Sequence, residues 1–198
     1  YPIAQELDLD NWHRLGFMLV LVNAAYVIGS TRRHLVIALS LAAPAVLLQG
    51  AAIGAESVHV DLVATIATLL CFLYVTFVCL VRVLEPGNIS MDRLIGAACV
   101  FLLMGLVWTM IFAIQLFFEP GALEGLSAEA RYSDELVYFS FVTLTTLGFG
   151  EITPATPMTR TTVWMEAVAG QLYLAILVAR LVGLPMASPR RSDAPDES

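Results

Sequence analysis

Apolar and polar positions fall into long blocks along this chain, with five apolar stretches separated by short polar links. Each stretch approaches or exceeds the ~20 residues that a helix needs to cross ~30 Å of hydrocarbon. The pattern predicts an all-α integral membrane protein. Its five predicted crossings are Asn11–Ser30, His34–Ala55, Val58–Leu84, Arg93–Phe118 and Thr159–Leu184.

A segment of another kind lies between the fourth and fifth predicted crossings. It begins with a polar loop at Glu119–Ser133, continues with a short apolar run at Asp134–Thr145 and ends in a glycine-rich turn. The apolar run is too short to span a bilayer. Ser133 is a suitable N-cap, and the carboxylates that follow it favour the positive end of a helix dipole. The segment is therefore predicted to be a half-helix that dips into the membrane from one side.

The composition agrees with a membrane protein, since 59% of the residues are hydrophobic and 14% are charged. A soluble domain carries about 25% charged residues. The three cysteines, Cys71, Cys79 and Cys99, all lie inside apolar stretches. They are therefore expected to be small buried thiols rather than parts of a disulfide framework.

The chain has no lysine, and the placement of its arginines predicts its orientation. The links after the first and third predicted crossings and the C-terminal tail hold Arg32, Arg33, Arg82, Arg93, Arg190 and Arg191. The opposite ends of the crossings carry mostly acidic residues. By the positive-inside rule the arginine ends are cytoplasmic, which puts the C-terminus inside the cell and the start of this chain outside. The expected location is the cell (inner) membrane, crossed several times, and an outside start suggests a further helix before Tyr1.

The glycine-rich turn at Thr145–Gly150 reads Thr-Thr-Leu-Gly-Phe-Gly and carries the candidate chemistry. Non-helical backbone is tolerated inside a membrane only where protein shields it or where it lines a water-filled path. Gly148 and Gly150 permit φ values that turn successive carbonyls the same way. Four such strands around an axis form rings of oxygens that replace the hydration shell of a cation, and Thr146 adds a hydroxyl ring at the inner end. No catalytic constellation and no phosphate cradle fits this context.

The turn resembles the filter signature Thr-Val-Gly-Tyr-Gly of the potassium channel family, in its prokaryotic type. The likeness extends over about Arg93–Leu184. Tyr138 and Phe139 fall where the family places aromatic residues that pack the filter from outside. Gly170 follows Gly150 by twenty residues, where the family commonly has the hinge glycine of its inner helix.

The resemblance implies an outer helix, a re-entrant pore helix with its filter, and an inner helix, with a homotetramer in the lipid bilayer forming the pore. It implies passive, potassium-selective conduction by a protein that is not an enzyme and has no nucleic-acid partner. Permeating potassium ions, with no other cofactor, are expected at the Thr146 hydroxyl and at the carbonyls of Thr146, Leu147, Gly148, Phe149 and Gly150. The expected filter-supporting residues are Thr145, Tyr138, Phe139, Glu151 and Glu166, and the expected gating hinge is Gly170.

Three positions depart from the family pattern, since Leu147 replaces valine, Phe149 replaces tyrosine and Glu151 replaces aspartate. Phe149 lacks the hydroxyl that would hydrogen-bond behind the filter, and Leu147 is bulkier and not β-branched. Both departures bear on filter rigidity, so a weakly selective monovalent cation channel is the alternative. A translocating subunit of a potassium uptake system and a non-conducting membrane scaffold are further alternatives.

The predicted organisation has three parts: a voltage-sensor-like region of three helices at 1–92, a pore domain at 93–184 and a disordered cytoplasmic tail at 185–198. Relatives that sense voltage carry arginines at every third position of the last helix before the pore. The equivalent stretch here, Val58–Leu84, holds Arg82 alone. Moving one charge through 100 mV is worth ~2.3 kcal/mol, so steep gating needs several charges per subunit. The channel is therefore not expected to be obviously voltage-gated, and residual voltage dependence is the alternative.

Several single residues allow two interpretations. A charge at the bilayer centre costs ~2.5–3.5 kcal/mol or more, so Glu166 is either a proton-sensitive group behind the filter or a structural acceptor bonded to the pore helix. Gly170 is either a hinge or a point where helices approach closely. Gln171 either lines the cavity or bonds between helices, and Arg180 is expected to snorkel to the inner leaflet.

Overall fold

The computed structural model describes residues 58–85, 91–127 and 134–183, together with positions 36, 40, 42–45 and 47–48. The predicted crossing at Asn11–Ser30, the predicted N-cap Ser133 and the predicted tail at 185–198 lie outside these residues. So does most of the predicted crossing at His34–Ala55. The fold below is that of the described part of the chain.

Three helices in this part are long and apolar enough to cross a membrane: α4 (Val58–Leu84), α5 (Met91–Phe118) and α7 (Pro157–Gly183). They have 27, 28 and 27 residues. At 1.5 Å per residue each rises about 40 Å, which exceeds the ~30 Å hydrocarbon thickness. The predicted bounds are confirmed for α4, whereas α5 and α7 each begin two residues earlier than predicted.

The earlier start of α7 has a local cause in Thr156 and Thr159. The Thr159 N–H donates to Thr156 Oγ1 at 3.3 Å, and the Thr156 N–H donates to Thr159 Oγ1 at 3.2 Å. This reciprocal arrangement is a capping box with threonine in the place of the usual glutamate. Pro157 follows at the first helical position, where its missing N–H needs no partner. The helix therefore begins at Pro157.

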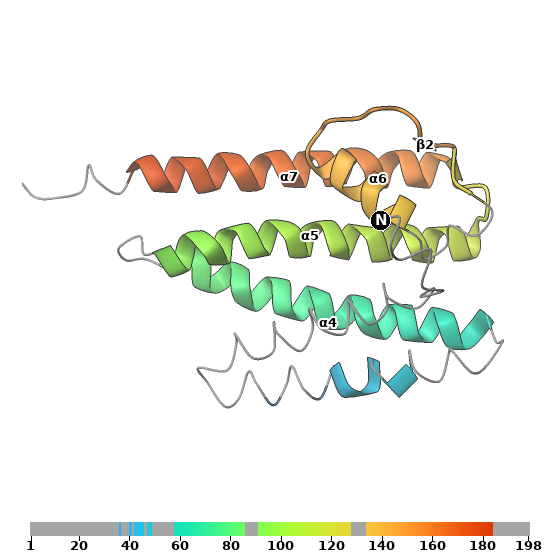
Figure 1. Ribbon diagram of the computed structural model, residues 1–198, viewed down its shortest axis with the longest axis horizontal. Helices are drawn as coiled ribbons and strands as arrows, with labels where there is room; N and C mark the ends of the chain where they lie inside the picture. The colour runs from blue at the N-terminus through green and yellow to red at the C-terminus, as the bar shows by residue number, and fades with distance from the viewer. Residues whose placement is uncertain are drawn as a thin grey trace, which may run out of the picture.

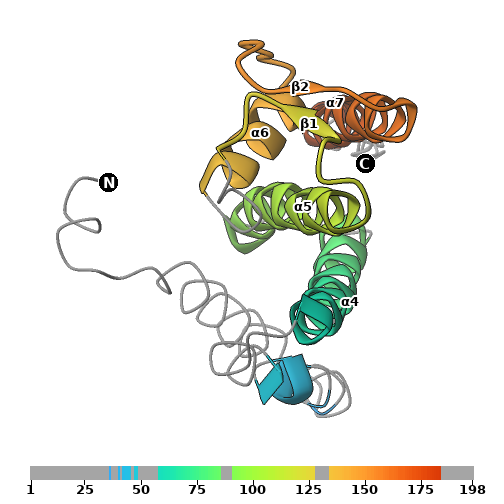
Figure 2. The same ribbon diagram turned by 90° about the vertical axis from the view of Figure 1, so that its right-hand side faces the viewer.

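The three long helices lie side by side, with α5 between α4 and α7 (Figure 1). The short helix α6 (Asp134–Leu144) packs against α5 and α7 near one end of the bundle. Figure 2 shows this arrangement along the helices, with the loop after α6 extending beyond them. The order of outer helix, half-helix, loop and returning helix is therefore the predicted one.

Two apolar clusters hold the helices together, one on each side of α5. In the first, Phe72 and Val75 of α4 pack with Leu103 and Val107 of α5. In the second, Phe112 of α5 lies against α6, together with the buried residues Ala113, Leu116, Ala122, Leu123, Leu136 and Phe139. The half-helix is thus anchored on the outer helix by burial of apolar side chains.

A pair of two-residue strands joins the loop after α5 to the loop before α7. β1 (Leu123–Glu124) pairs antiparallel with β2 (Thr153–Pro154). The Ala122 carbonyl adds to this junction, because it accepts from the Ala155 N–H and from Thr159 Oγ1, both at 2.9 Å. Strands this short leave no periodic signal in the sequence, and they were not predicted.

The cysteines do not all match the expectation of buried thiols. All three are free, and Cys71 is buried, Cys79 is half-buried and Cys99 is exposed. The expectation is therefore wrong for Cys99, because apolar residues on a membrane-crossing helix face lipid or neighbouring subunits as readily as the core of their own chain.

Candidate ion-conducting site

The helix α6 ends in a turn that begins the candidate filter, Thr146–Gly150. The Leu147 N–H donates to the Val142 carbonyl at 2.9 Å, and the Thr146 N–H donates to the Thr143 carbonyl at 2.8 Å. Thr146 has a φ of 56°. These two bonds around a left-handed residue form a Schellman motif, in which glycine usually takes the left-handed position. A threonine in that conformation costs about 1–2 kcal/mol, so the turn stores some backbone strain.

Positive φ recurs at every second residue of the candidate filter. Thr146, Gly148 and Gly150 have φ values of 56°, 57° and 85°. A Cβ added at either glycine would meet nothing within 4 Å in this chain, so steric crowding is not the reason for glycine at these positions. The reason is the backbone conformation, which other residues rarely adopt. Alternation between the two hands turns successive carbonyls toward one side of the strand. The predicted conformation of the two glycines is confirmed, and the same conformation at Thr146 was not predicted.

Tyr138 connects the half-helix to the outer end of the candidate filter. Its hydroxyl donates to Glu151 Oε1 at 2.9 Å, and its ring stacks on Phe149 with centroids 6.4 Å apart and planes within 3°. A tyrosine hydroxyl is protonated at neutral pH, so it is the donor in this bond. Phe139 points elsewhere, since its ring lies edge-on to Phe112 of α5 at 5.0 Å. Phe149 lacks a hydroxyl, and Tyr138 supplies one beside it.

We expect Tyr138→Phe to shorten the conducting bursts of single channels while leaving the ring stack on Phe149 in place. The lost bond to Glu151 links the half-helix to the outer end of the candidate filter, so the strand is held less firmly without it. Recordings in planar bilayers measure the burst duration. Glu151→Gln is the matched control, since its side-chain carbonyl still accepts from Tyr138 and a smaller effect is expected. Bursts of unchanged length in Tyr138→Phe would contradict a supporting role for this bond.

Polar side chains also hold the inner end of the candidate filter. Gln171 of α7 donates from Nε2 to Thr146 Oγ1 at 3.2 Å. The Thr145 hydroxyl turns back to the half-helix and donates to the Phe141 carbonyl at 2.7 Å. Of the two interpretations of Gln171, the structure shows a bond between α7 and the filter strand. This bond depends on the register of two separate segments, so the sequence left it open.

Glu166 of α7 is fully buried against the half-helix. Its Oε1 lies 2.5 Å from Ser140 Oγ, which also lies 2.8 Å from the Gly105 carbonyl of α5. Glu166 Oε2 has no partner within the described residues. A hydroxyl has one hydrogen, so Ser140 can donate to only one of these two oxygens. If Ser140 donates to the carbonyl, the short contact to Glu166 requires a hydrogen on the carboxyl. A neutral carboxyl, which carries its own hydrogen, satisfies both contacts, and Glu166 links α7 to the half-helix through Ser140.

Two glycines let the half-helix lie close to both of its neighbours. A Cβ on Gly105 of α5 would come within 2.6 Å of the Phe141 ring, and a Cβ on Gly170 of α7 would come within 2.3 Å of the Leu144 carbonyl oxygen. Gly170 lies in the middle of a continuous helix. In the structure, Gly170 is thus a point of close approach between α7 and the half-helix. Its role as a gating hinge stays a prediction. Gly105 was not predicted, although a single glycine in an apolar helix is the usual signal of such contact.

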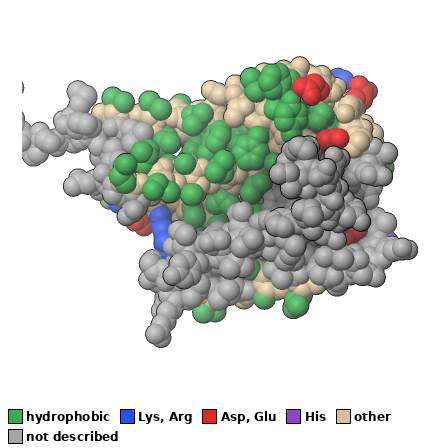
Figure 3. Space-filling view, in the orientation of Figure 1, with side chains coloured by type: hydrophobic (Ala, Val, Ile, Leu, Met, Phe, Trp, Pro, Cys, Tyr) green, Lys and Arg blue, Asp and Glu red, His purple; other side chains and the backbone are tan. Residues whose placement is uncertain are grey.

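Charged side chains separate between the two ends of the bundle. Figure 3 shows acidic groups gathered around the end that carries the loop after α6. This end has Glu119, Glu124, Asp134, Glu135 and Glu151, with Arg160 as its described basic residue. The other end has Arg82 in the last turn of α4, Arg93 near the start of α5 and Arg180 in the last turn of α7. In the described part of the chain, three arginines lie at one end, the arginine end, where Glu85 and Asp92 also occur, and most of the acidic residues lie at the other, the acidic end.

Comparison with known proteins finds a family likeness in the second half of the chain. A family model described as an ion channel matches residues 97–186, which include most of α5, all of α6, the candidate filter and α7. This region is therefore similar to a pore-loop ion channel domain. No curated protein and no solved structure matches the chain. Together with the three helices that are long and apolar enough to cross a membrane, this match supports a multi-pass membrane protein.

The match confirms the pore-loop channel resemblance and the all-α membrane fold. Its residues begin and end slightly later than the predicted pore domain at 93–184. The region at 1–92 lies outside the match, so its division from the pore and its voltage-sensor-like character stay predictions. The assignment of individual filter and support residues also stays a prediction.

Proposed function

We propose that the chain is one subunit of a potassium-selective channel, in which four copies surround a common axis. The observation that carries the proposal is the alternation of left-handed residues at Thr146, Gly148 and Gly150. Such a strand offers its carbonyls in a row to a dehydrated cation, and a ring of four strands completes each coordination site. One pore segment per chain makes the homotetramer the assembly that closes this ring.

Exposure of the filter strand in a single chain supports an assembly of several copies. Every residue from Thr145 to Gly150 is exposed, including the large apolar side chains of Leu147 and Phe149. Isolated strands with unpaired backbone are not stable in hydrocarbon, so other copies of the chain would have to shield this strand. The function is passive conduction without covalent chemistry, with potassium at the carbonyls of the candidate filter and at the Thr146 hydroxyl and with no other cofactor.

The charge distribution supports an orientation with the arginine end in the cytoplasm. Arg82, Arg93 and Arg180 lie at that end, where the positive-inside rule places basic residues. The C-terminus is then cytoplasmic and the filter opens to the outside, in a cell (inner) membrane. The half-helix points its negative C-terminal end toward the pore, where it favours a cation.

Bi-ionic reversal potentials test the proposed selectivity. Purified protein in planar bilayers, with potassium on one side and sodium on the other, is expected to reverse near the potassium equilibrium potential. Equal permeability of the two ions would sink the selective interpretation and favour the weakly selective cation channel, which the bulky Leu147 in the filter makes the second candidate. If liposomes that contain the protein show no barium-sensitive ion flux, the interpretation as a non-conducting membrane scaffold is favoured.

We expect the open probability to change little with voltage. Within the described residues α4 carries Arg82 as its only arginine, near the membrane surface in its last turn, where it crosses almost none of the field. Several charges per subunit must cross the field for steep gating, because one charge contributes ~2.3 kcal/mol per 100 mV. Single-channel recordings between about −100 and about +100 mV measure how the open probability depends on voltage. A steep sigmoidal response would contradict the expectation.

A further inference from the structure

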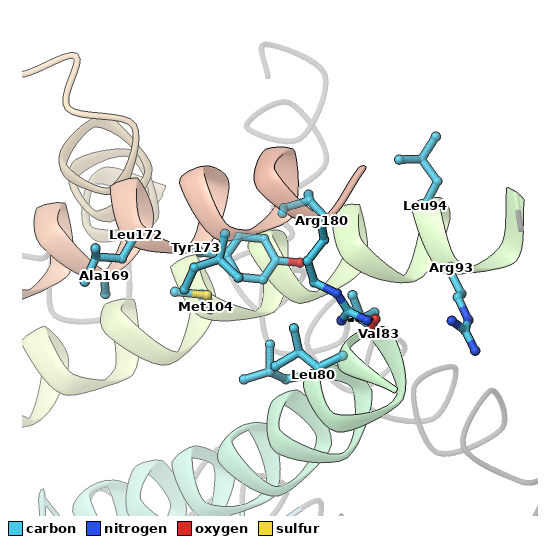
Figure 4. Close-up of a pocket in the computed structure, with 12 residues that line it drawn as sticks. Leu80, Val83, Arg93, Leu94, Met104, Ala169, Leu172, Tyr173 and Arg180 are labelled. Carbon is cyan, nitrogen blue, oxygen red and sulfur yellow. Dashed lines mark hydrogen bonds between the residues drawn. The ribbon is translucent and has the colours of Figure 1, made fainter. Parts of the chain in front are cut away.

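An apolar cavity of about 280 Å³ lies where α4 ends, α5 begins and α7 ends (Figure 4). Its wall includes Leu80 of α4, Met104 of α5 and Leu172 of α7. Arg93 and Arg180 are the only charged residues that line it among the described part of the chain. The cavity thus combines a long apolar wall with positive charge, and the ion pathway does not use it.

The two arginines and the apolar wall lie at different depths in the membrane. Met104 is eleven residues along α5 from Arg93, and Ala169 is eleven residues along α7 from Arg180. Both separations correspond to about 16 Å along a helix, about half the thickness of the hydrocarbon. The helix ends place the arginines at headgroup level, so the apolar wall extends from there toward the middle of the bilayer.

Arg180 holds its charge at the mouth of this cavity through contacts to backbone. Its Nη1 donates to the Val83 carbonyl and its Nη2 to the Glu85 carbonyl, both at 3.0 Å, and Figure 4 shows the side chain reaching from α7 toward Val83. Arg93 donates from Nη1 to the same Glu85 carbonyl at 3.1 Å. The two carbonyl oxygens at the end of α4 fix the Arg180 guanidinium without neutralising it as a carboxylate would. A guanidinium carries five N–H donors, so Arg180 retains donors for a further anion.

We propose that this cavity binds one anionic phospholipid of the leaflet at the arginine end. Its phosphate accepts hydrogen bonds at Arg93 and Arg180, and one acyl chain lies along Leu80, Met104 and Leu172. The volume of about 280 Å³ is many times the ~10–15 Å³ of such space that one water molecule needs, so it has room for part of an acyl chain. The assignment of this leaflet to the cytoplasmic side rests on the orientation in the proposed function, whereas the proposed lipid binding does not depend on that orientation.

Charge decides which lipid is retained. An acyl chain leaves one apolar environment for another when it enters the cavity, so burial alone gives little preference among lipids. A planar guanidinium matches the geometry of a phosphate, and a zwitterionic headgroup carries a positive charge that opposes its approach. A basic residue near an anionic surface favours binding by about fivefold. Phosphatidylglycerol is therefore preferred to phosphatidylcholine at this site.

Electron spin resonance with spin-labelled lipids tests the proposal on the full chain in vesicles. Labelled phosphatidylglycerol and phosphatidylcholine are added separately, and the immobilised fraction of each is measured. The wild-type protein is expected to hold phosphatidylglycerol in preference by about fivefold or more. The preference should fall as the salt concentration rises. This measurement does not involve ion flux, so its failure and a failure of the proposed channel function are distinguishable.

Four variants separate the charge, the cavity and the fold. Arg93→Gln with Arg180→Gln is expected to lose the preference, and Arg180→Lys is expected to retain it because the charge stays. Leu172→Trp fills the cavity without touching charge and is expected to release the immobilised lipid. Arg160→Gln is the control, since this arginine lies at the acidic end and bonds to the Pro154 carbonyl. It should leave the preference unchanged.

Several results would overturn the proposal. Equal retention of the two lipids by the wild-type protein excludes the site, and so does full retention by Leu172→Trp. A loss in Arg180→Lys as large as in the double variant assigns the arginines a structural role only. Displacement of the labelled lipid by millimolar inorganic phosphate shows a site for free phosphate. A change of oligomer size in Leu172→Trp, without a change in lipid retention, shows that a second copy of the chain fills the cavity.

Discussion

Gly170→Ala is expected to abolish ion conduction and to lower the stability of the folded protein. The added methyl group would lie 2.3 Å from the Leu144 carbonyl oxygen, at the C-terminal end of the half-helix. A backbone oxygen cannot rotate away as a flexible side chain can, so α6 or α7 must shift. Overpacking of this kind costs about 1–3 kcal/mol. Because Leu144 ends α6 two residues before the candidate filter, the shift displaces the filter strand itself.

The sign of the stability change distinguishes the two interpretations of Gly170. Alanine is the better helix former, and replacing glycine in a helix stabilises it by about 0.5–1 kcal/mol when nothing else changes. If Gly170 served only as a hinge, Gly170→Ala would therefore raise thermal stability and alter gating alone. If close packing dominates, the same substitution lowers thermal stability and conduction together. Thermal unfolding followed by circular dichroism, with flux from liposomes, measures both quantities.

Gly96→Ala is the matched control for this substitution. Gly96 also lies in a membrane-crossing helix, but a Cβ there would meet only Val83 Cγ2, at 3.3 Å. A side-chain methyl group can move by a few tenths of an ångström, so the variant is expected to conduct and to be at least as stable as the wild type. A Gly170→Ala protein that conducts normally with higher stability would refute the packing interpretation.

The pore elements could be predicted from the sequence because each depends on residues near one another in the chain. The bounds of α4 follow from an unbroken apolar run between polar links, and α6 follows from a run too short to cross. The conformation of Gly148 and Gly150 follows from the residue type itself. Thr146 in the same conformation does not, because a helix C-cap imposes it on a residue that disfavours it.

The contacts between elements could not be predicted, since they depend on the rotation and register of whole helices. The Tyr138 hydroxyl meets Glu151 across thirteen positions, and Arg180 meets Val83 across ninety-seven. Nothing in the local sequence of Arg180 distinguishes a snorkelling side chain from one that holds the end of α4. The same reason applies to Glu166, whose partner Ser140 could be named only once α6 and α7 were placed side by side.

Glu166→Gln is expected to conduct like the wild type, whereas Glu166→Ala is expected to lose most conduction and stability. An amide has nearly the shape of a carboxyl group and can still donate to Ser140 Oγ, which lies 2.5 Å from Glu166 Oε1. Alanine instead leaves a cavity behind the half-helix and removes the partner of a buried hydroxyl. Truncating a buried side chain of this size costs about 2–5 kcal/mol.

The contrast between the two variants follows from the position of a single hydrogen. Ser140 Oγ lies within bonding distance of both the Gly105 carbonyl and Glu166, and it has one hydrogen to donate. A neutral carboxyl supplies the second hydrogen and avoids the cost of a buried charge. Glutamine supplies it too, whereas an ionised Glu166 would leave two acceptors in contact. Ion flux and thermal stability of both variants are measured at about pH 6 and at about pH 8, on either side of neutrality.

The wild type and Glu166→Gln are expected to behave alike, because an amide keeps the shape and the donor of a neutral carboxyl. Ser140→Ala is the matched partner variant: it removes the shared hydroxyl, so Glu166→Gln should have no further effect in its presence. A Glu166→Gln channel that fails to conduct, or that loses a pH dependence present in the wild type, would show that the ionised carboxylate is required. Glu166 would then be the proton-sensitive group behind the filter rather than a neutral link between α7 and the half-helix.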